Sequence, residues 1–271
     1  MPELPEVETV KEGLNKIIEP PQVIRQVTFW RKNLRTDLPL KESKNLSGQE
    51  IKKIYRRAKY IIIETNDYSI ISHLGMTGSW RVSHEAPGTH DHVGLELSNG
   101  TRLVYRDPRR FGIFDILPKD QLNQDQRFRL LGPEPLSNDF NEAYLFSRSR
   151  HKKVPVKNFI MDQRVVVGVG NIYASEALFM AQISPLVQAQ KVSQAKYKLL
   201  VRSIEKVLTK AIKSGGSTIR NFAAADGESG YFQQSLKVYG RDGEPCRKCG
   251  TRIKNKILAG RSTFWCVKCQ K

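Results

Sequence analysis

Long apolar runs are missing from this 271-residue sequence, and their absence limits where the protein can work. No stretch approaches the ~20 apolar residues that a membrane-spanning helix needs. The first residues, MPELPEVETV, also lack the basic and apolar regions of a secretion signal. We therefore expect a cytoplasmic protein that is not associated with a membrane.

Negative charge is also scarce. The chain has 45 Lys and Arg residues against 27 Asp and Glu, which gives a formal net charge of +18 and an isoelectric point of about 9.8. Such a surplus is typical of a surface that binds a polyanion. Nucleic acid is the leading partner class, and a membrane surface is its rival.

Cysteine is rare, and its placement is informative. The four cysteines follow a C-x2-C-x16-C-x2-C pattern near the C-terminus: Cys246, Cys249, Cys266 and Cys269. Four thiolates at this spacing close a tetrahedral structural zinc site with no position open for catalysis. Two redox dithiols are the alternative, which is disfavoured because no βαβ pattern surrounds either pair. Between the pairs, TRIKNKIL and STFWC predict two strands joined by residues 259–261, so that zinc would hold a hairpin with Arg261 at its tip.

The first half of the chain reads as mainly β. The segments QVTFW (26–30), IKKIYRRAKYIIIET (51–65) and FGIFDIL (111–117) predict strands. HVGLELSNGTRLVYRD predicts a hairpin with a type I′ turn at Asn99-Gly100. Because several short strands cannot leave their apolar faces bare, we expect a two-sheet sandwich or flattened barrel.

The first residues predict a helix. Its apolar stripe has helical spacing and consists of Leu4, Val7, Val10, Leu14 and Ile17. Pro5 and the acidic residues suit a first helical turn, where a missing N–H costs nothing and carboxylates favour the helix dipole. Pro2 has no role in that pattern and needs another explanation.

The second half reads as helical. The polar, proline-bearing stretch between about residues 118 and 155 predicts a linker. Beyond it, NIYASEALFMAQ and VSQAKYKLLVRSIEKVLTKAI predict helices, and the second should end at Gly215-Gly216. Residues 217–235 carry several glycines and few aliphatic side chains, so we expect a mobile loop there.

Some short motifs suit DNA binding, although each also has a structural reading. GVGNIYASE could present backbone N–H groups and Asn171 to a phosphate at a helix start, or could be only a turn. Arg109 and Phe111 in DPRRFG could form a wedge that fills the gap left by an extruded base, together with Met76 of HLGM. A solvated arginine pair and ordinary packing are the alternatives.

Two further motifs carry titratable groups. His90-Asp91-His92 reads as a polar loop that contacts phosphate, because no third metal ligand lies at a recognisable spacing. Lys59 in RRAKY precedes apolar residues in a predicted strand. Partial desolvation would lower its pKa and suit it to proton transfer, whereas a solvated edge lysine is equally compatible with the sequence.

Together, PELPEVET, RRAKY, HLGM, HDH, DPRRFG, LGPEPL, GVGNIYASE and the paired cysteines closely resemble bacterial formamidopyrimidine-DNA glycosylases from end to end. The resemblance implies an α+β protein in three parts. These are an N-terminal β-sandwich with a leading helix (1–132), a helix-two-turns-helix domain with a lesion-capping loop at 217–235 (133–235), and a zinc finger built on a β-hairpin (236–271).

The resemblance also implies an activity and a set of site residues. The protein would be a monomer with one structural zinc ion. It would excise oxidised purines, chiefly 8-oxoguanine and formamidopyrimidines, from duplex DNA and cleave the resulting abasic site by β,δ-elimination. Pro2 would be the nucleophile, forming a Schiff base, and Glu3 the acid that opens the sugar, with Lys59 and Arg261 assisting. The expected DNA contacts and void-filling residues are Met76, His90, Arg109, Phe111, Lys152 and Asn171.

Two other functions stay open from the sequence. An endonuclease VIII type would act on oxidised pyrimidines, but its opening typically reads PEGPE whereas this chain has PELPE. A non-catalytic zinc-ribbon protein that only binds nucleic acid is the other alternative, and composition does not exclude it.

Overall fold

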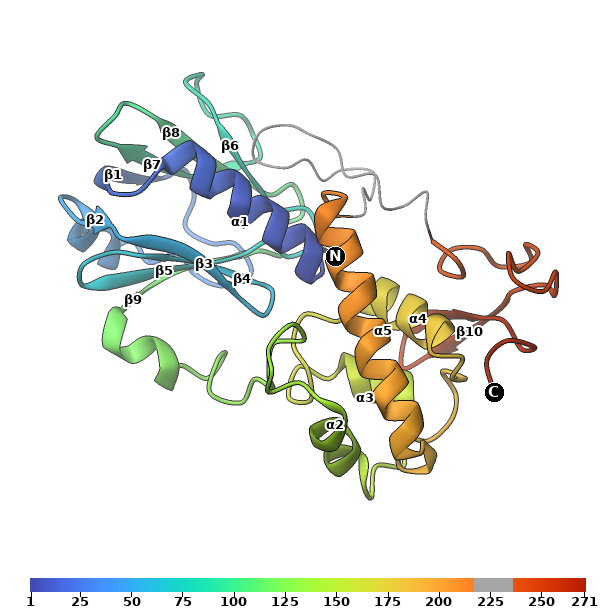
Figure 1. The fold of residues 1–271 in the computed structure, drawn as a ribbon. Coiled ribbons are helices and arrows are strands. Elements are labelled where there is room, and N and C mark those ends of the chain that lie inside the picture. The colour runs from blue at the N-terminus through green and yellow to red at the C-terminus, as the bar shows by residue number, and fades with distance from the viewer. Residues whose placement is uncertain (217–235) are drawn as a thin grey trace. The chain divides into compact units, whose positions relative to one another are not determined.

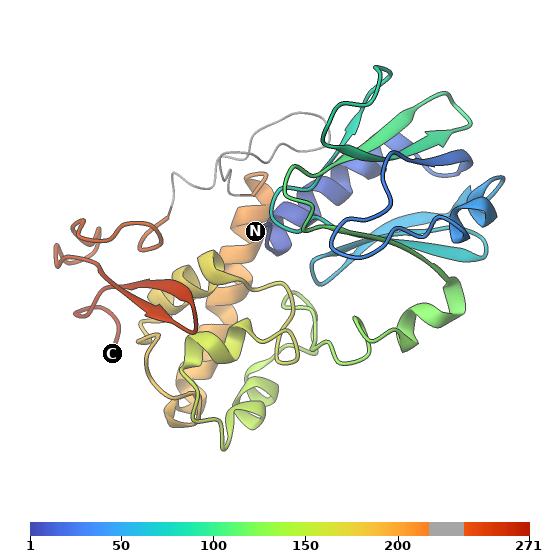
Figure 2. The same cartoon turned by 180° about the vertical axis from the view of Figure 1, so that it is seen from behind.

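The computed structural model describes residues 1–216 and 236–271, which form two compact units (Figures 1 and 2). The first comprises residues 1–129 and 214–216, and the second comprises residues 130–213 and 236–271. The loop expected at 217–235 lies outside the described residues. Among the described residues, no helix has the length and apolar character to span a membrane.

The first unit is the expected β-sandwich, made of two antiparallel sheets. The larger sheet has the strand order β2-β1-β7-β8-β6 and the smaller one β3-β4-β5-β9. The strands are β1 (Gln22–Phe29), β2 (Glu50–Ile51), β3 (Lys53–Arg57), β4 (Tyr60–Glu64), β5 (Tyr68–His73), β6 (Ser79–Val82), β7 (Asp91–Leu97), β8 (Arg102–Arg106) and β9 (Ile113–Pro118). One hydrophobic core draws on both sheets and includes Ile63, Trp80 and Phe114.

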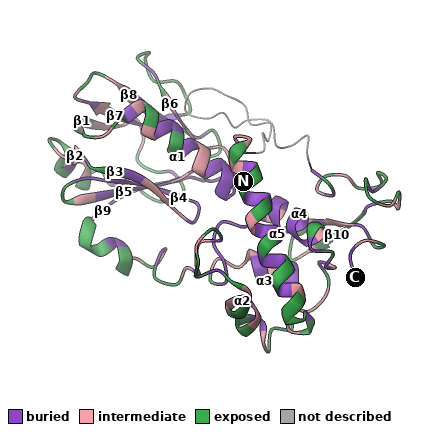
Figure 3. Ribbon diagram, in the orientation of Figure 1, coloured by how far each residue is buried: buried purple, intermediate pink, exposed green. Residues whose placement is uncertain are grey.

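The leading helix α1 (Leu4–Ile18) forms as the apolar pattern predicts. Its buried stripe runs through Leu4, Val7, Val10 and Leu14 and continues at Ile18, while Ile17 is only partly buried. Figure 3 shows buried segments of α1 alternating with more exposed ones. A capping box closes its first turn: the Glu3 side chain accepts from the backbone N–H of Glu6, and the Glu6 carboxylate accepts from that of Glu3 at 2.8 Å. The helix start is therefore fixed by the carboxylates next to Pro2.

The predicted β7–β8 hairpin is present, but the predicted type I′ turn is wrong. The last paired residues of the hairpin are Leu97 and Thr101, so the loop between them consists of three residues, 98–100. Only Gly100 in this loop has a positive φ, of 84°, and the Asn99 side chain accepts from the N–H of Thr101. A type I′ turn needs two consecutive residues at positive φ, whereas a three-residue loop needs one.

The second unit is mainly helical. Its elements are α2 (Glu142–Ser149), α3 (Val156–Met161), α4 (Asn171–Met180), the 3-10 helix η3 (Ala189–Lys191), α5 (Gln194–Lys213) and the hairpin β10 (Lys254–Leu258) with β11 (Arg261–Trp265). Helix α5 ends at two glycines of positive φ, as predicted. The stretch 118–155, predicted as a linker, contains two helical elements: the 3-10 helix η2 (Lys119–Gln124) and α2. The Asn141 side chain caps the start of α2. The remaining 3-10 helix, η1 (Glu42–Leu46), lies in the first unit.

The hairpin of the cysteine module is tighter than the sequence suggested. Its turn contains only Ala259 (φ 45°) and Gly260 (φ 74°), both in the left-handed conformation of a type I′ turn. Arg261 is the first residue of β11 and pairs with Leu258, so it lies beside the tip and not on it.

Candidate functional site

The N-terminus gathers chemically active groups in a buried setting. Pro2, Glu3 and Glu6 are all buried. Lys59 belongs to the turn between β3 and β4, next to Ala58 at φ 55°, and only 7% of its surface is exposed. The sequence had suggested either a lysine within a strand or a solvated edge lysine. Both interpretations are wrong, because Lys59 is a buried turn residue.

Charges at this site act on the amino terminus. Burial lowers the pKa of the Met1 α-amino group below its ordinary value of 8.0, while the carboxylates of Glu3 and Glu6 raise that pKa and the charges of Lys59 and Arg109 lower it again. A lower pKa leaves more of the amine neutral at physiological pH. The surroundings of the amino end therefore favour the neutral form of the Met1 amine.

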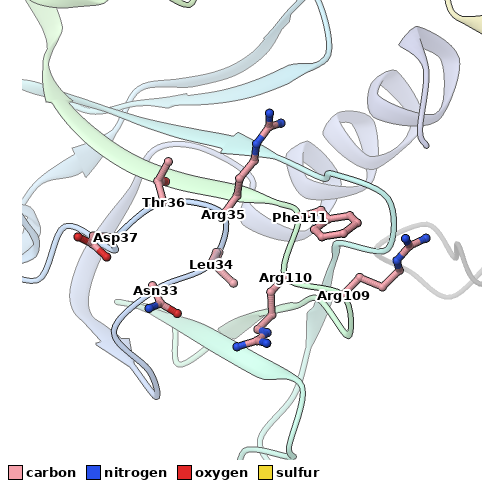
Figure 4. A pocket seen from close by; sticks show the side chains of 8 residues that line it. All are labelled: Asn33, Leu34, Arg35, Thr36, Asp37, Arg109, Arg110 and Phe111. Carbon is pink, nitrogen blue, oxygen red and sulfur yellow. The ribbon is translucent and has the colours of Figure 1, made fainter. Parts of the chain in front are cut away.

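Two neighbouring loops carry the residues predicted to form a wedge. Met76 is 41% exposed and Phe111 44% exposed, so neither residue belongs to the core. The Arg109 guanidinium lies 4.8 Å from the centre of the Phe111 ring (Figure 4). The loops touch at Gly75, where a Cβ atom would clash with the carbonyl carbon of Phe111. Met76, Arg109 and Phe111 thus belong to one loop cluster and are not core packing.

A basic cavity of about 730 Å³ opens beside this cluster. Loop 33–37 forms the other wall of the cavity. A hydrogen bond from the Arg35 N–H to the Gly112 carbonyl at 3.3 Å joins it to the loop of residues 107–112, which with the loop of Met76 makes up the wedge loops. The lining residues are Asn33, Leu34, Arg35, Thr36, Asp37, Arg109, Arg110 and Phe111 (Figure 4). Three arginines against one carboxylate suit an anionic ligand such as a nucleic-acid backbone.

The HDH motif divides between surface and core. His90 is exposed, as a phosphate contact requires. His92 is buried, and its Nε2 lies 2.8 Å from the Asp107 carbonyl oxygen. Asp91 is buried against Arg81. The prediction of a polar loop therefore holds only for His90, and the cysteines are the only potential metal-binding cluster in the described part of the chain.

In the second unit, the predicted contact residues lie at two helix boundaries. Lys152 is exposed between α2 and α3. Asn171 is the first residue of α4, and its side-chain amide donates to the Ser262 carbonyl at 3.0 Å. That amide nitrogen carries a second hydrogen, so it can still donate to a ligand. Asn171 therefore links the start of α4 to the residue after Arg261.

Two buried charges in this unit escaped the sequence analysis. Lys157 is 1% exposed in α3 and donates to the Ser262 carbonyl (3.1 Å) and the Thr263 hydroxyl (2.8 Å), directly beyond Arg261. Glu176 in α4 accepts the backbone N–H groups of residues 237–239 at 2.8 to 2.9 Å. Burial raises the pKa of Glu176, and these three donors oppose that rise. A lone charged residue among apolar neighbours was the available sequence signal in both VPVKNFI and NIYASEALF.

The four cysteines fit a zinc ion. Their Sγ atoms all lie within 4.8 Å of one another, with 3.5 Å between Cys249 and Cys266 and 3.9 Å between Cys246 and Cys269. Zn–S bonds of about 2.3 Å in a tetrahedron require sulfur separations of roughly 3.8 Å. The ion, bound by all four thiolates, would tie the two turns at the ends of the β10–β11 hairpin together.

Comparisons with known proteins follow the same order of segments. Family models match residues 1–114 (formamidopyrimidine-DNA glycosylase N-terminal domain), 131–223 (formamidopyrimidine-DNA glycosylase H2TH domain) and 243–271 (zinc finger found in FPG and IleRS). This order of domains places the chain in the class of helix-two-turns-helix (H2TH) enzymes that carry a zinc finger.

Individual relatives match over the whole chain. Identity is 52% to the formamidopyrimidine-DNA glycosylase of Bdellovibrio bacteriovorus and 48% to that of Sphingopyxis alaskensis, with 100% of both chains covered in each case. A Lactococcus lactis FPG variant solved with Fapy-dG containing DNA superposes with a TM-score of 0.92 at 36% identity, again over 100% of both chains. MutM in complex with carbocyclic 8-oxo-G containing DNA gives 0.90 at 37% identity, also over 100% of both chains. The chain belongs to the formamidopyrimidine-DNA glycosylase family.

Proposed function

We propose that this chain excises oxidised purines from duplex DNA and cleaves the strand at the resulting abasic site, using Pro2 as the nucleophile. Membership in the family makes it a DNA glycosylase of base excision repair. Relatives were solved with DNA containing Fapy-dG, carbocyclic 8-oxo-G or an abasic site, which supports the substrate class. The observation that carries the Pro2 assignment is that Pro2, Glu3 and Glu6 are buried at the chain start, where the charge of the buried Lys59 also acts on the amino terminus.

The proposed chemistry begins once Met1 has been removed, which leaves Pro2 with a secondary amine. The neutral amine attacks the sugar C1′ and loses its proton, and the glycosidic bond breaks so that the base leaves with the bonding electrons and takes up a proton. Glu3 protonates the ring oxygen as the ring opens, giving a cationic iminium between the Pro2 nitrogen and C1′. Glu6 accepts the Glu3 N–H and so orients the terminus.

The iminium explains why a secondary amine suits the reaction. It has no N–H to lose, so it stays positively charged and acts as an electron sink. Loss of a C2′ proton then expels the 3′-phosphate by β-elimination, and δ-elimination expels the 5′-phosphate. Lys59 and Arg261 assist with proton transfer and phosphate contacts in this proposal.

DNA binding involves all three proposed domains. Residues 1–132 would supply the chemistry and the contacts of His90, Arg109, Met76 and Phe111. Residues 133–235 would supply Lys152 and Asn171, and residues 236–271 the zinc-supported Arg261. The proposal includes a monomer that works on DNA in the cytoplasm, in association with the nucleoid.

Oxidised pyrimidines remain a second candidate substrate, because the Lactococcus lactis FPG was also solved with oxidized pyrimidine containing DNA. A lesion panel should therefore include both base classes. The purely DNA-binding zinc-ribbon alternative is wrong, since the chain matches an enzyme family from end to end.

Borohydride reduction tests the nucleophile directly. The mature protein should form a covalent complex with 8-oxoguanine duplex under borohydride, and peptide mapping should place the adduct on Pro2. A form that retains Met1 should not be trapped, and Glu3→Gln should lose base excision. An adduct on Lys59, or undiminished trapping with Met1 retained, would overturn the assignment of Pro2.

A further inference from the structure

The buried carboxylate of Asp107 joins the two loops that carry the wedge. Asp107 is fully buried at the start of the DPRRFG segment. Its Oδ1 accepts the hydroxyl of Thr77 and, at 3.3 Å, the backbone N–H of Arg109, while its Oδ2 accepts the Gly112 N–H at 2.7 Å. The Thr77 hydroxyl oxygen also accepts the Arg109 N–H at 3.2 Å. One side chain thus ties the loop of Met76 to both ends of the 109–112 segment.

The main chain of Asp107 extends this network toward His90. Its N–H donates to the His90 carbonyl at 3.0 Å, and its carbonyl accepts the Arg110 N–H at 3.2 Å. Arg110 has a φ of 58°, a left-handed conformation that is strained for a residue with a Cβ atom. Such a turn persists only when its surroundings enforce it, and Asp107 supplies bonds on both sides of the strained residue.

Exposed side chains need this kind of support. Met76 and Phe111 are 41% and 44% exposed, so packing alone holds these residues less firmly than it holds core residues. Backbone that is ordered before DNA arrives avoids the entropy of ordering a loop during binding. Gly75 and Gly112 add to the rigidity: a Cβ atom on either residue would clash with the opposite loop or with Tyr105.

We infer that Asp107 and Thr77 are positioning residues that hold Met76, Arg109 and Phe111 in the geometry needed to fill the void left by an extruded base. The inference rests on the proposed function. It assigns these residues to base extrusion and not to the later strand cleavage. A duplex that already contains an abasic site has no base to extrude, so its cleavage should depend less on them.

A threonine series separates positioning from general stability. Thr77→Val removes the hydroxyl but keeps the shape, and Thr77→Ser keeps the hydroxyl. Thr65→Val is the matched control, because Thr65 is a buried threonine whose hydroxyl bonds Gln49 and Tyr68 at the β4–β5 turn. Each protein is checked by circular dichroism and assayed at saturating enzyme on 8-oxoguanine duplex and on preformed abasic duplex.

Thr77→Val should slow 8-oxoguanine excision about tenfold, the effect of losing one hydrogen bond to a charged group, and should slow abasic cleavage much less. Thr77→Ser should restore excision, and Thr65→Val should lower the melting temperature without this selective loss. Asp107→Asn should show the same selectivity as Thr77→Val. Equal rates for all threonine variants, or equal losses on both duplexes, would overturn the positioning role. A wild-type protein inactive on both duplexes would instead overturn the proposed function.

Discussion

The pH dependence of folding should report on one half-buried histidine, His73. This residue ends β5, accepts the Gly75 N–H through Nδ1 at 3.0 Å, and packs against the Tyr60 ring at 4.9 Å between centroids. Burial, together with the nearby charges of Lys59 and Arg35, lowers the pKa of His73 from 6.5 to about 4. The folded protein therefore keeps this side chain neutral at pH values where an unfolded chain binds a proton.

The magnitude follows from the two pKa values. Between pH 6.5 and about 4 the unfolded state binds one more proton than the folded state, so stability is lost as the pH falls through this window. The linkage relation gives a loss, relative to pH 7, of about 2 kcal/mol at pH 5 and about 3 kcal/mol at pH 4. Well below pH 4 both states are protonated and the contribution levels off.

The control variant is His73→Asn. The asparagine side-chain oxygen can take the place of Nδ1 as the acceptor for the Gly75 N–H, but it does not titrate. Both proteins are studied in a Trp265→Phe background, so that tryptophan fluorescence reports on Trp30 and Trp80 of the first unit. Subtracting the two pH profiles from urea unfolding cancels acid effects that both proteins share, including loss of zinc. Parallel profiles from pH 7 to pH 4 would refute the reasoning.

Three further predictions concern the cysteine module and DNA binding. Cys249→Ser should lose the zinc ion and abolish DNA binding while residues 1–117 stay folded, as measured by metal content, gel shift and circular dichroism; full activity of a metal-free sample would contradict it. The logarithm of the DNA affinity should fall with log[salt] at a slope near −0.9 per phosphate contact, and Arg109→Ala should reduce lesion excision more than it flattens that slope; a salt-independent affinity would argue against the basic surface. Ala259→Asn should stabilise the module by about 1 kcal/mol in urea unfolding, because asparagine tolerates the left-handed conformation better than alanine; an unchanged midpoint would argue against strain at this turn.

Features with a local cause could be predicted from the sequence. The period of apolar residues placed α1, and Gly215-Gly216 marked the end of α5. The four cysteines at x2 and x16 spacing indicated a zinc module whose sulfur atoms do converge. Asn99-Gly100 marked a hairpin correctly. Its turn type was wrong because strand register, and not the dipeptide alone, sets how many residues close the loop.

The position of the predicted wedge could not be derived from spacing. Met76 and Phe111 lie far apart in sequence, and each motif alone is compatible with ordinary packing. Their convergence depends on the β8–β9 connection passing over the end of β5, where Gly75 touches Phe111. Lys59 was misplaced for a similar reason: RRAKY reads as continuous strand, whereas Ala58 adopts a positive φ and turns the chain.

The residues that escaped prediction share one physical feature. Asp107, Lys157 and Glu176 are buried charges that bond backbone groups: the two acids accept backbone N–H groups, and the lysine donates to the Ser262 carbonyl as well as to the Thr263 hydroxyl. Backbone groups are the same at every position, so no complementary residue elsewhere in the sequence marks such a pair. A buried charge costs several kcal/mol unless it is hydrogen-bonded, so its persistence indicates that the segment it holds needs a fixed geometry. Here those segments are the wedge loops, the strand that begins at Arg261, and residues 237–239 before the zinc module, and the first two carry groups proposed to contact DNA.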